Sequence, residues 1–287
     1  MNLTLRQLEI FAAVAVHEHI GRAAEELSLS PSAASMALGE LENVIGYPLF
    51  DRIARRIVLN EHGRLLLPKV LALLDRAEEI EAGMADGQPA GHLRVGASTT
   101  IGNYLLPGIV GAFANACPAI QVQLEVNNTQ SIIRHLLEHR LDLALVEGPV
   151  SHSDLVESVW TDDELVVFAA PAQANVSLDA AQWIMREPGS GTREVFEQAM
   201  RAAGHPIHLR LELGHTEAIK KAVEAGLGLG CLSRRVIVRE LELGYVVPVP
   251  WPGLALRRTF SLFWHRQKYH SAAFERFVAF CRQAVQK

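Results

Sequence analysis

The first 60 residues place apolar side chains at the spacing of short amphipathic helices. The first helix is indicated by a repeat of apolar positions: Leu8, Phe11, Ala12 and Ala15. Two further helices are expected at about residues 21–27 and 31–44. Ser30 suits the N-cap of the third helix, Pro31 suits its first position, and Gly46 suits its end. The pattern predicts three short helices, with a helix–turn–helix formed by the second and third.

A short hairpin and a long helix follow. Apolar residues flank a basic tip between residues 49 and 59, which indicates two short strands. Asn60 suits the N-cap of a helix that fades at Gly83, and Pro68 is expected to bend it. The apolar stripe of this helix comprises Leu66, Val70, Leu73, Ala77 and Ile80. Because a linker follows at 86–91, we expect the stripe to lack cover within the chain and to pack on a second copy.

From residue 92 the pattern changes to strands that alternate with helices. The expected strands are about 92–97, 120–126, 141–146, 156–160, 165–170, 183–186, 207–213, 229–232 and 258–265. The expected helices are about 101–115, 129–139, 192–203, 216–225 and 271–285. This alternation predicts a mostly parallel, doubly wound sheet, and its length fits two α/β lobes.

These patterns divide the chain into three parts. The expected parts are a helix–turn–helix domain at 1–60, a linker helix and hinge at 61–90, and a two-lobed domain at 91–287. Within the last part, lobe 1 is expected at about 91–162 plus 266–287, and lobe 2 at about 163–265.

The composition is that of a folded protein. Apolar residues make up 49% of the chain and charged residues 21%, which excludes disorder as the main state. Cys117, Cys231 and Cys281 are far apart and form no CxxC pair, which fits a reducing compartment. No signal-peptide pattern and no run of 18 apolar residues is present. We therefore expect a cytoplasmic protein that does not bind membranes.

The third helix has two different faces. Its apolar positions are Ala34, Leu38, Leu41 and Ile45, and its small or polar positions on the other side are Ser32, Ser35, Met36, Gly39 and Asn43. Side chains of the second kind suit the major groove, where serine hydroxyls reach base edges and Met36 contacts a thymine methyl. The candidate DNA-binding residues of this helix are therefore Ser30, Pro31, Ser32, Ser35 and Met36.

Charge by itself does not indicate a nucleic-acid partner. The chain has a net charge of −5, and residues 1–60 hold five basic and seven acidic side chains, a net charge of −2. Three of the five arginines nevertheless cluster in the hairpin. We expect Arg52, Arg55 and Arg56, together with Arg22, to contact phosphates. The alternative is a three-helix bundle that binds a protein and leaves the arginine hairpin in solvent.

Candidate ligand-binding residues follow the strands of the two-lobed part. Ligands of doubly wound sheets bind beyond the carboxyl ends of strands. Ser98, Thr99 and Thr100 are three consecutive hydroxyl residues at such a place, and together with backbone N–H groups they suit a small anion. The alternative is ordinary helix capping, which needs only one of the three.

Later strand ends repeat this chemistry. The further candidate residues are Asn128, Thr129, Glu147, Gly148, Ser190, Thr192, Arg193 and His215. A glycine-rich turn leads into Thr192 and Arg193, and it forms a two-sided clamp if it faces Ser98 across a cleft. The sequence leaves two interpretations of Glu147 equal. Its carboxylate accepts hydrogen bonds from a ligand, or it pairs with a basic residue across the cleft.

Other chemical motifs are set aside. His135, Glu138 and His139 spell HxxEH on one helix without a third ligand, so we expect a solvated helix face and no metal. Cys231 has no resolving partner near it in the sequence, so we expect it to pack in the core. The chain has neither a GxSxG elbow nor a nucleotide fingerprint, and we expect no cofactor.

Three stretches resemble the winged helix–turn–helix of LysR-type transcriptional regulators. They are AAEELSLSPSAAS at 23–35, GYPLFDR at 46–52 and RRIVLNEHG at 55–63. The resemblance extends over essentially the whole chain. It implies an α/β fold with an N-terminal winged helix–turn–helix, a long linker helix and a two-lobed effector domain like that of periplasmic solute-binding proteins. It also implies dimers through the linker helix, tetramers through the effector domains, near-palindromic double-stranded DNA, and RNA polymerase as a further partner.

The sequence departs from this family in the DNA-reading helices. His19 and Gly21 stand where the family often has Ser or Thr, and Met36 and Ala37 stand where a polar or basic residue is common. Both changes remove hydrogen-bonding groups. We therefore expect Ser32 and Ser35 to carry more of the base recognition.

The C-terminal part is similar to a branch that includes regulators of sulfur assimilation and of carbon fixation. The similar stretches are 98–107, 146–149 and 186–193. The resemblance implies an anionic effector between the lobes, either an inorganic sulfur oxyanion or a phosphorylated or carboxylated metabolite.

The predicted function is that of a ligand-responsive DNA-binding regulator, and the resemblance favours an activator that also represses. The alternative is a cytoplasmic small-molecule-binding protein or an enzyme that uses the two-lobed domain. Because a helix–turn–helix with a basic hairpin has no role in such an enzyme, we predict that the protein is not an enzyme.

Overall fold

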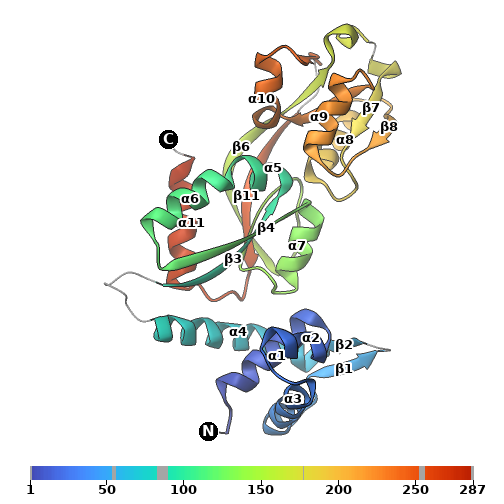
Figure 1. The fold of residues 1–287 in the computed structure, drawn as a ribbon. Helices are drawn as coiled ribbons and strands as arrows, with labels where there is room; N and C mark the ends of the chain where they lie inside the picture. The colour runs from blue at the N-terminus through green and yellow to red at the C-terminus, as the bar shows by residue number, and fades with distance from the viewer. Residues whose placement is uncertain (1, 54–55, 83–89, 177, 252–255, 286–287) are drawn as a thin grey trace.

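The structure is a computed structural model of the chain, and it describes residues 2–53, 56–82, 90–176, 178–251 and 256–285. Figure 1 shows a small N-terminal unit on one side of a long helix, α4 (Glu61–Ala82), and two α/β lobes on the other. No helix in the described ranges combines the length and the apolar character that a membrane span needs.

The N-terminal unit has the predicted three helices and hairpin. Its elements are α1 (Leu5–His17), α2 (Ile20–Glu26), α3 (Pro31–Ile45), β1 (Phe50–Ile53) and β2 (Arg56–Leu59). Phe11, Ala23 and Leu41 are fully buried in one shared core. The two strands pair antiparallel, with Ile53 opposite Arg56, and they form the wing of a winged helix–turn–helix.

Helix α4 begins as predicted, with the Asn60 side chain accepting a hydrogen bond from the backbone at 3.0 Å. Val70 is 2% exposed, and Leu66 packs against the N-terminal core. The expectation that the apolar stripe lacks cover within the chain is therefore wrong for its first half, because α1 packs alongside α4. Leu73 and Ile80 remain exposed, at 43% and 80%.

The second half of α4 docks on lobe 1 through a cluster of ion pairs. The Lys268 ammonium lies between the carboxylates of Asp75 and Asp142, and Arg94 contacts Asp142 at 2.9 Å. Burial alone would raise the pKa of Asp142, but the two cations outweigh burial and lower it to about 2. These contacts hold the N-terminal unit against the two-lobed domain.

Lobe 1 has a parallel sheet in which β3 pairs with both β4 and β5. Its elements are β3 (Gly91–Ser98), α5 (Thr99–Tyr104), α6 (Leu106–Ala116), β4 (Ile120–Asn127), α7 (Thr129–Leu137), β5 (Leu143–Glu147) and α11 (Ala272–Ala284). The single helix expected at 101–115 is two helices that meet at Leu105. Pro107 accounts for the break, because it has no N–H to continue the helical hydrogen bonds.

Lobe 2 repeats this plan, with β7 parallel to both β8 and β9. Its elements are η1 (Pro171–Gln173), η2 (Leu178–Ala180), β7 (Gln182–Met185), α8 (Gly191–Ala202), β8 (His208–Glu212), α9 (Thr216–Glu224), β9 (Leu229–Ser233), α10 (Arg234–Glu242) and β10 (Val247–Pro248). The sequence pattern missed α10. Most of this helix is charged, and only Val236 and Ile237 bury an apolar face.

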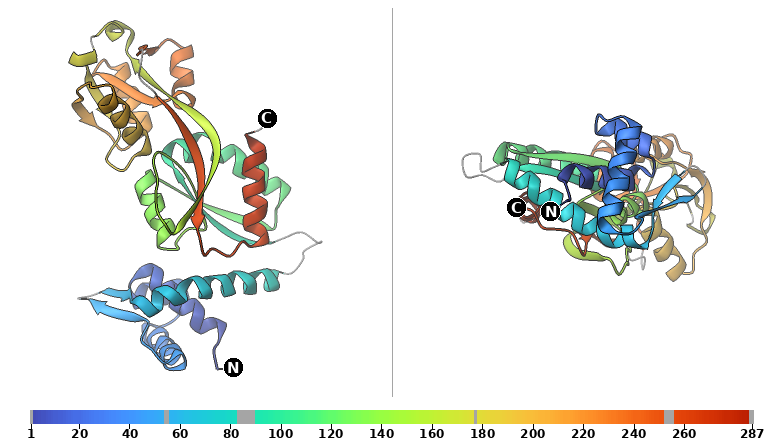
Figure 2. Two further views of the ribbon diagram at one scale, coloured as in Figure 1. Left: turned by 180° about the vertical axis from the view of Figure 1, so that it is seen from behind. Right: turned by 90° about the horizontal axis from the view of Figure 1, so that it is seen from below.

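Two long strands, β6 (Leu155–Ala169) and β11 (Arg257–His265), connect the lobes (Figure 2, left). The described sheet runs β4-β3-β5-β11-β6-β9-β7-β8. Because β11 is antiparallel to β5 and β6, and β6 is antiparallel to β9, the expectation of a mostly parallel sheet is wrong at the centre. The two strands expected at 156–160 and 165–170 are one strand, because the charged stretch between them pairs with β11.

Candidate functional sites

The polar face of α3 lies in solvent, as its pattern predicted. The Ser30 hydroxyl accepts a hydrogen bond from Ala33 N at 3.2 Å, and Pro31 is the first helical residue. Ser32, Ser35 and Met36 are exposed, and Met36 is 66% exposed. The helix therefore presents small polar groups and one apolar side chain that its own domain leaves uncovered.

The arginines of the wing are also exposed. Arg52 and Arg56 lie on the two paired strands, and Arg56 makes a long ion pair of 3.5 Å with Glu18. Arg22 is exposed in the first turn of α2. Arg55 lies outside the described residues. Exposed pairs of this length contribute little to stability, so these side chains are available to a partner.

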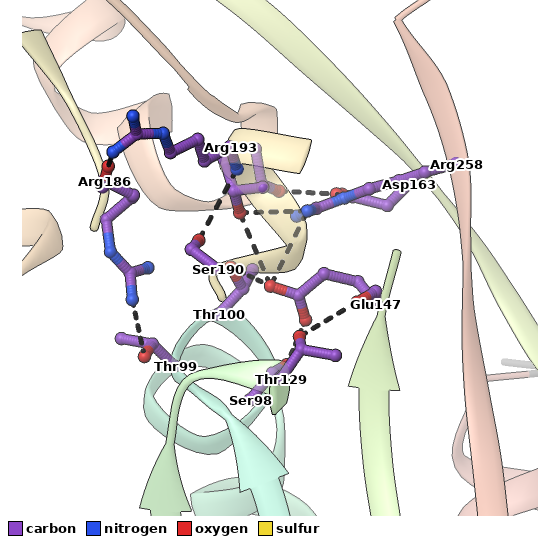
Figure 3. Close-up of polar contacts among 12 residues, drawn as sticks. Ser98, Thr99, Thr100, Thr129, Glu147, Asp163, Arg186, Ser190, Arg193 and Arg258 are labelled. Atoms are coloured by element: carbon purple, nitrogen blue, oxygen red, sulfur yellow. Dashed lines mark hydrogen bonds and ion pairs between the residues drawn. The ribbon is translucent and has the colours of Figure 1, made fainter. Parts of the chain in front are cut away.

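The two-lobed domain has a buried carboxylate at its centre, that of Glu147 at the end of β5 (Figure 3). Glu147 is 2% exposed. Ser98 and Thr100 donate hydrogen bonds to it from lobe 1, the latter at 3.2 Å, and Thr192 donates from lobe 2 at 3.4 Å. The hydroxyls that the sequence suggested for binding an anion thus already surround one, which belongs to the protein itself.

Helix capping does not explain these hydroxyls. Ser98 is the N-cap residue of α5, yet its side chain makes no capping hydrogen bond. Thr99 donates to the Asn127 carbonyl at 3.4 Å, and Thr100 donates to Glu147. All three hydroxyls are engaged in contacts between elements.

Arg258 of β11 joins the Glu147 carboxylate to lobe 2. Its side chain is 2% exposed, and its Nη1 lies 3.6 Å from Glu147 Oε1. Nε donates to Asp163 at 2.7 Å and Nη1 donates to Thr192 at 2.9 Å, while Ser233 donates to the other Asp163 oxygen at 2.7 Å. Nη2 has no hydrogen-bond partner among the described residues. Glu147 thus lies beside a base of the neighbouring strand β11, and its role toward a ligand stays a prediction.

The lobes approach each other closely beside this network. A Cβ on Gly191 would lie 2.0 Å from the Glu147 carbonyl oxygen, and a Cβ on Gly148 would lie 2.8 Å from the Gly191 Cα. Gly148 also has a φ of +95°, in the left-handed region that favours glycine. Thr129 donates to the Glu147 carbonyl at 2.9 Å. The backbone therefore requires glycine at both positions, where the two lobes are in direct contact beside Glu147.

A second set of contacts bridges the lobes at the side of the cleft. Arg186 is 3% exposed, and its Nη2 donates to the Thr99 hydroxyl at 3.1 Å. Arg186 also pairs with Glu187 at 2.8 Å, and Asn128 donates to Glu187 at 3.2 Å. Burial would raise the pKa of Glu187, but the hydrogen bond and charge of Arg186 lower it below its ordinary value.

Besides Thr99 and Asn128, three more of the sequence-predicted residues lie outside the Glu147 network. Ser190 caps α8 by accepting from the Arg193 N–H at 3.5 Å. The Arg193 guanidinium binds carboxylates of its own lobe, Glu197 and Glu212, each at 2.6 Å, and Figure 3 shows it turned toward Arg186. His215 is exposed at the start of α9. A role of these residues toward a ligand stays a prediction.

Sequence reasoning missed the buried Arg258 with its partner Asp163, and the contact of the buried Arg186 with Thr99. Arg258 is the second residue of β11, just before the mainly apolar centre of this strand, and its charge was the available signal. The register of the strand decides which residues Arg258 contacts. A further contact between the lobes was also missed. Tyr104 donates to Glu217 at 2.5 Å, and Glu217 pairs with the buried Lys220 at 2.6 Å. Burial, together with the hydrogen bond to Glu217, raises the pKa of Tyr104 to about 12.

The histidine and cysteine motifs that the sequence analysis set aside make contacts within the fold. His135 Nδ1 lies 2.7 Å from Glu125, so the ring faces a neighbouring strand. The expectation that His135 faces solvent is therefore wrong. No cluster that would hold a metal ion occurs among the described residues. Cys231 is buried, and burial raises the pKa of its thiol, which agrees with core packing.

Both parts of the chain match known protein families. Residues 5–64 match the bacterial regulatory helix-turn-helix protein, lysR family, and residues 86–286 match the LysR substrate binding domain. YeiE of Escherichia coli K12, an uncharacterized HTH-type transcriptional regulator, is 44% identical over 291 residues, 99% of each chain. The RuBisCO operon transcriptional regulator of Allochromatium vinosum is 34% identical over 291 residues, covering 97% of this chain and 96% of that protein.

A solved structure of similar fold holds a ligand. The regulatory domain of CcmR from Synechocystis PCC6803, solved in complex with 2-PG, is 29% identical. The match covers 69% of this chain and 98% of that domain, with a TM-score of 0.63. The relatives are named as transcriptional regulators, which agrees with the prediction of a regulator and not an enzyme.

Proposed function

The chain belongs to the LysR family of transcriptional regulators, and from this premise we propose that a small anion bound between its lobes controls how it holds promoter DNA. Membership makes it a DNA-binding regulator with an effector-binding domain. The nature of the effector, the residues that bind it and the DNA geometry are the content of the proposal.

On DNA, α3 enters the major groove with Ser32, Ser35 and Met36 toward the bases. Their exposure supports this role. The exposed arginines of the wing and of α2 contact phosphates on either side: Arg22, Arg52, Arg55 and Arg56. Two such units bind a near-palindromic site in successive major grooves.

A second copy covers the exposed part of α4. Leu65, Leu73 and Ile80 leave 65%, 43% and 80% of their surface open, which favours a helix-to-helix dimer. Dimers pair through the effector domains into tetramers. The protein acts in the cytoplasm, where the DNA lies, and RNA polymerase is the further partner of an activator.

The observation that carries the anionic effector is the Glu147 carboxylate amid three hydroxyls and a guanidinium. These donors already solvate one carboxylate in a buried place. An anion of similar size meets the same donors if Glu147 turns away. Because Ser98 and Thr100 come from lobe 1, and Thr192 and Arg258 from lobe 2 or the strands that connect the lobes, exchange of the anion changes the lobe angle. The effector shifts the equilibrium only by its different affinity for the two arrangements.

The test is a thermal-shift titration of the full chain with sulfite, sulfate, phosphate, sugar phosphates and small carboxylates. Binding to the folded state alone raises the melting temperature by mass action. We expect one class of anion to raise it and Thr100→Ala to abolish the rise. The matched control is Ser151→Ala, which removes an exposed hydroxyl outside the cleft.

Substitution of Glu147 tests whether its carboxylate competes with the effector for the same hydrogen-bond donors. If the carboxylate competes with the effector, Glu147→Gln raises anion affinity by roughly tenfold, the worth of one charge-assisted hydrogen bond. No shift with any anion, in either the wild type or this variant, would rule out the anionic effector while leaving the DNA-binding function in place.

A further inference from the structure

A groove between the N-terminal unit and lobe 1 gathers arginines from both domains. It has a volume of about 380 Å³ and is lined by residues of α1, α2, the wing and the α7 region. Its charged lining comprises Arg22, Arg56, Arg134, Arg140, Glu18 and Glu138, and His17 also lines it. Figure 1 shows α7 facing the side of the N-terminal unit that carries α2 and the wing. We call this surface the junction groove.

The arginines of the junction groove are only weakly engaged. Arg56, Arg134 and Arg140 have side-chain exposures of 77%, 64% and 40%. Their ion pairs are long: Arg56 lies 3.5 Å from Glu18, while Arg134 and Arg140 lie 4.0 and 3.8 Å from Glu138. Exposed pairs at such distances contribute little, so the cations exchange a carboxylate for another anion at small cost.

We propose that the junction groove binds the sugar-phosphate backbone of the same duplex that α3 reads, so that the effector domain contacts DNA through Arg134 and Arg140. The inference rests on the proposed placement of Arg22 and Arg56 on phosphates. These two arginines line the groove together with Arg134 and Arg140 of lobe 1, so two expected phosphate contacts and two lobe 1 arginines share one surface.

Charge favours this occupant. Residues 1–60 have a net charge of −2, so the N-terminal unit alone offers few cations to a polyanion. The lining of the groove has two more arginines than glutamates. A duplex carries a phosphate charge about every 1.7 Å of its axis, and each neutralised phosphate releases condensed counterions. Arginines from lobe 1 therefore supply binding free energy that the winged domain lacks.

This contact would also link the effector to DNA affinity. Arg134 lies in α7, whose N-terminal residue Thr129 donates to the Glu147 carbonyl. A change at Glu147 that moves lobe 1 relative to the wing brings Arg134 and Arg140 toward the phosphates or away from them. Effector binding then alters the number of phosphates neutralised, and this number is measurable.

The test compares the full-length wild type with Arg134→Ala/Arg140→Ala on operator and random duplexes over a range of salt concentrations. Each lost phosphate contact lowers the slope of log affinity against log salt by about 0.9, so we expect a slope smaller by about 1.8. At low salt the affinity should fall on the order of tenfold for both duplexes. Glu138→Gln should act in the opposite direction, because it frees both arginines.

The matched control is Arg201→Ala/Arg239→Ala, which removes two exposed arginines of lobe 2 with the same change in net charge. It should leave the slope unchanged. An identical slope for the wild type and Arg134→Ala/Arg140→Ala would overturn the inference. It would direct attention to an acidic protein as the occupant of the groove. A wild type that binds no duplex would instead overturn the proposed use of Arg22 and Arg56, so the two failures are distinguishable.

Discussion

The proposed DNA-binding face of α3 and the proposed effector site around Glu147 both carry polar side chains, but the partners of these side chains differ. Ser32, Ser35 and Met36 on α3 face solvent. In the cleft, Glu147 and Arg258 are almost fully buried, and their partners are residues of the same chain. The α3 side chains are exposed to solvent, while the buried polar groups around Glu147 bond to one another.

The difference follows from what desolvation costs. A buried polar group destabilises the fold unless it is hydrogen-bonded. Around Glu147 the hydroxyls, carboxylates and guanidinium bond to one another, and among the described residues only Arg258 Nη2 of this network lacks a partner. Exposed groups on α3 and the wing carry no such requirement. Changes in the cleft should therefore alter stability first, and changes on the DNA face should alter affinity alone.

The largest expected effect belongs to Arg258→Ala. It removes the only cation paired with Glu147 among the described residues and leaves Asp163 with only the half-exposed Arg235, 3.6 Å away. Removal of one partner from a buried pair costs about 3–5 kcal/mol of stability. Denaturant unfolding of the full chain measures this loss. Arg257→Ala is the control, because it removes an exposed arginine from the adjacent position of β11 and should cost under about 0.5 kcal/mol. Equal losses in the two variants would contradict the assignment of the network to Arg258.

A smaller effect is expected where lobe 1 faces the N-terminal unit. There the ring of His139 lies 4.2 Å from that of His265. Burial, with His265, Lys268 and Arg94 nearby, lowers the pKa of His139 to about 4. Because the folded pKa lies below the unfolded value of 6.5, the unfolded state binds more protons between these values. Stability should thus decline as the pH falls from about 6.5 to about 4, by about 3 kcal/mol.

Unfolding measured at several pH values checks this decline. His139→Asn should reduce it, and Asn suits the left-handed backbone of this residue, whose φ is 56°. His208→Asn, at an exposed position of β8, should leave the decline as in the wild type. A variant at 139 with the full decline would place the titrating group elsewhere.

The smallest effect in free energy is expected on the open face. Arg52→Ala/Arg56→Ala should weaken binding to every duplex sequence by roughly tenfold and reduce the salt slope by about 1.8. The melting temperature should not change, because neither side chain is buried. Duplex titrations at several salt concentrations measure both quantities. If the variant lost only its preference for the operator, the wing would be reading bases and not phosphates.

Much of the N-terminal unit was predictable because its signals are local. Ser30, Pro31 and Gly46 mark the ends of α3, and the spacing of Ala34 and Leu41 fixes which side of the helix is buried. Caps and helical periodicity act within a few residues, so the exposed face of α3 follows from the order of residues alone.

The cleft was predictable only in part. The positions of Ser98, Thr100 and Glu147 at strand ends agree with the rule for open α/β sheets. Arg193 shows the limit of such reasoning, because a guanidinium next to a glycine-rich turn looked suited to a ligand and instead binds Glu197 and Glu212. A long side chain reaches several neighbours, and the sequence does not say which of them is nearest.

The sequence by itself determined the helix–turn–helix, the order of the domains, the family and the residue types at the strand ends. Only the tertiary structure decided that α1 covers half of α4, that β6 and β11 run antiparallel through both lobes, and that Arg258 meets Glu147. The last of these facts depends on the register of β11 against β5, two strands that lie more than a hundred residues apart in the chain. Register is set by the packing of the whole sheet, and no local pattern carries that information.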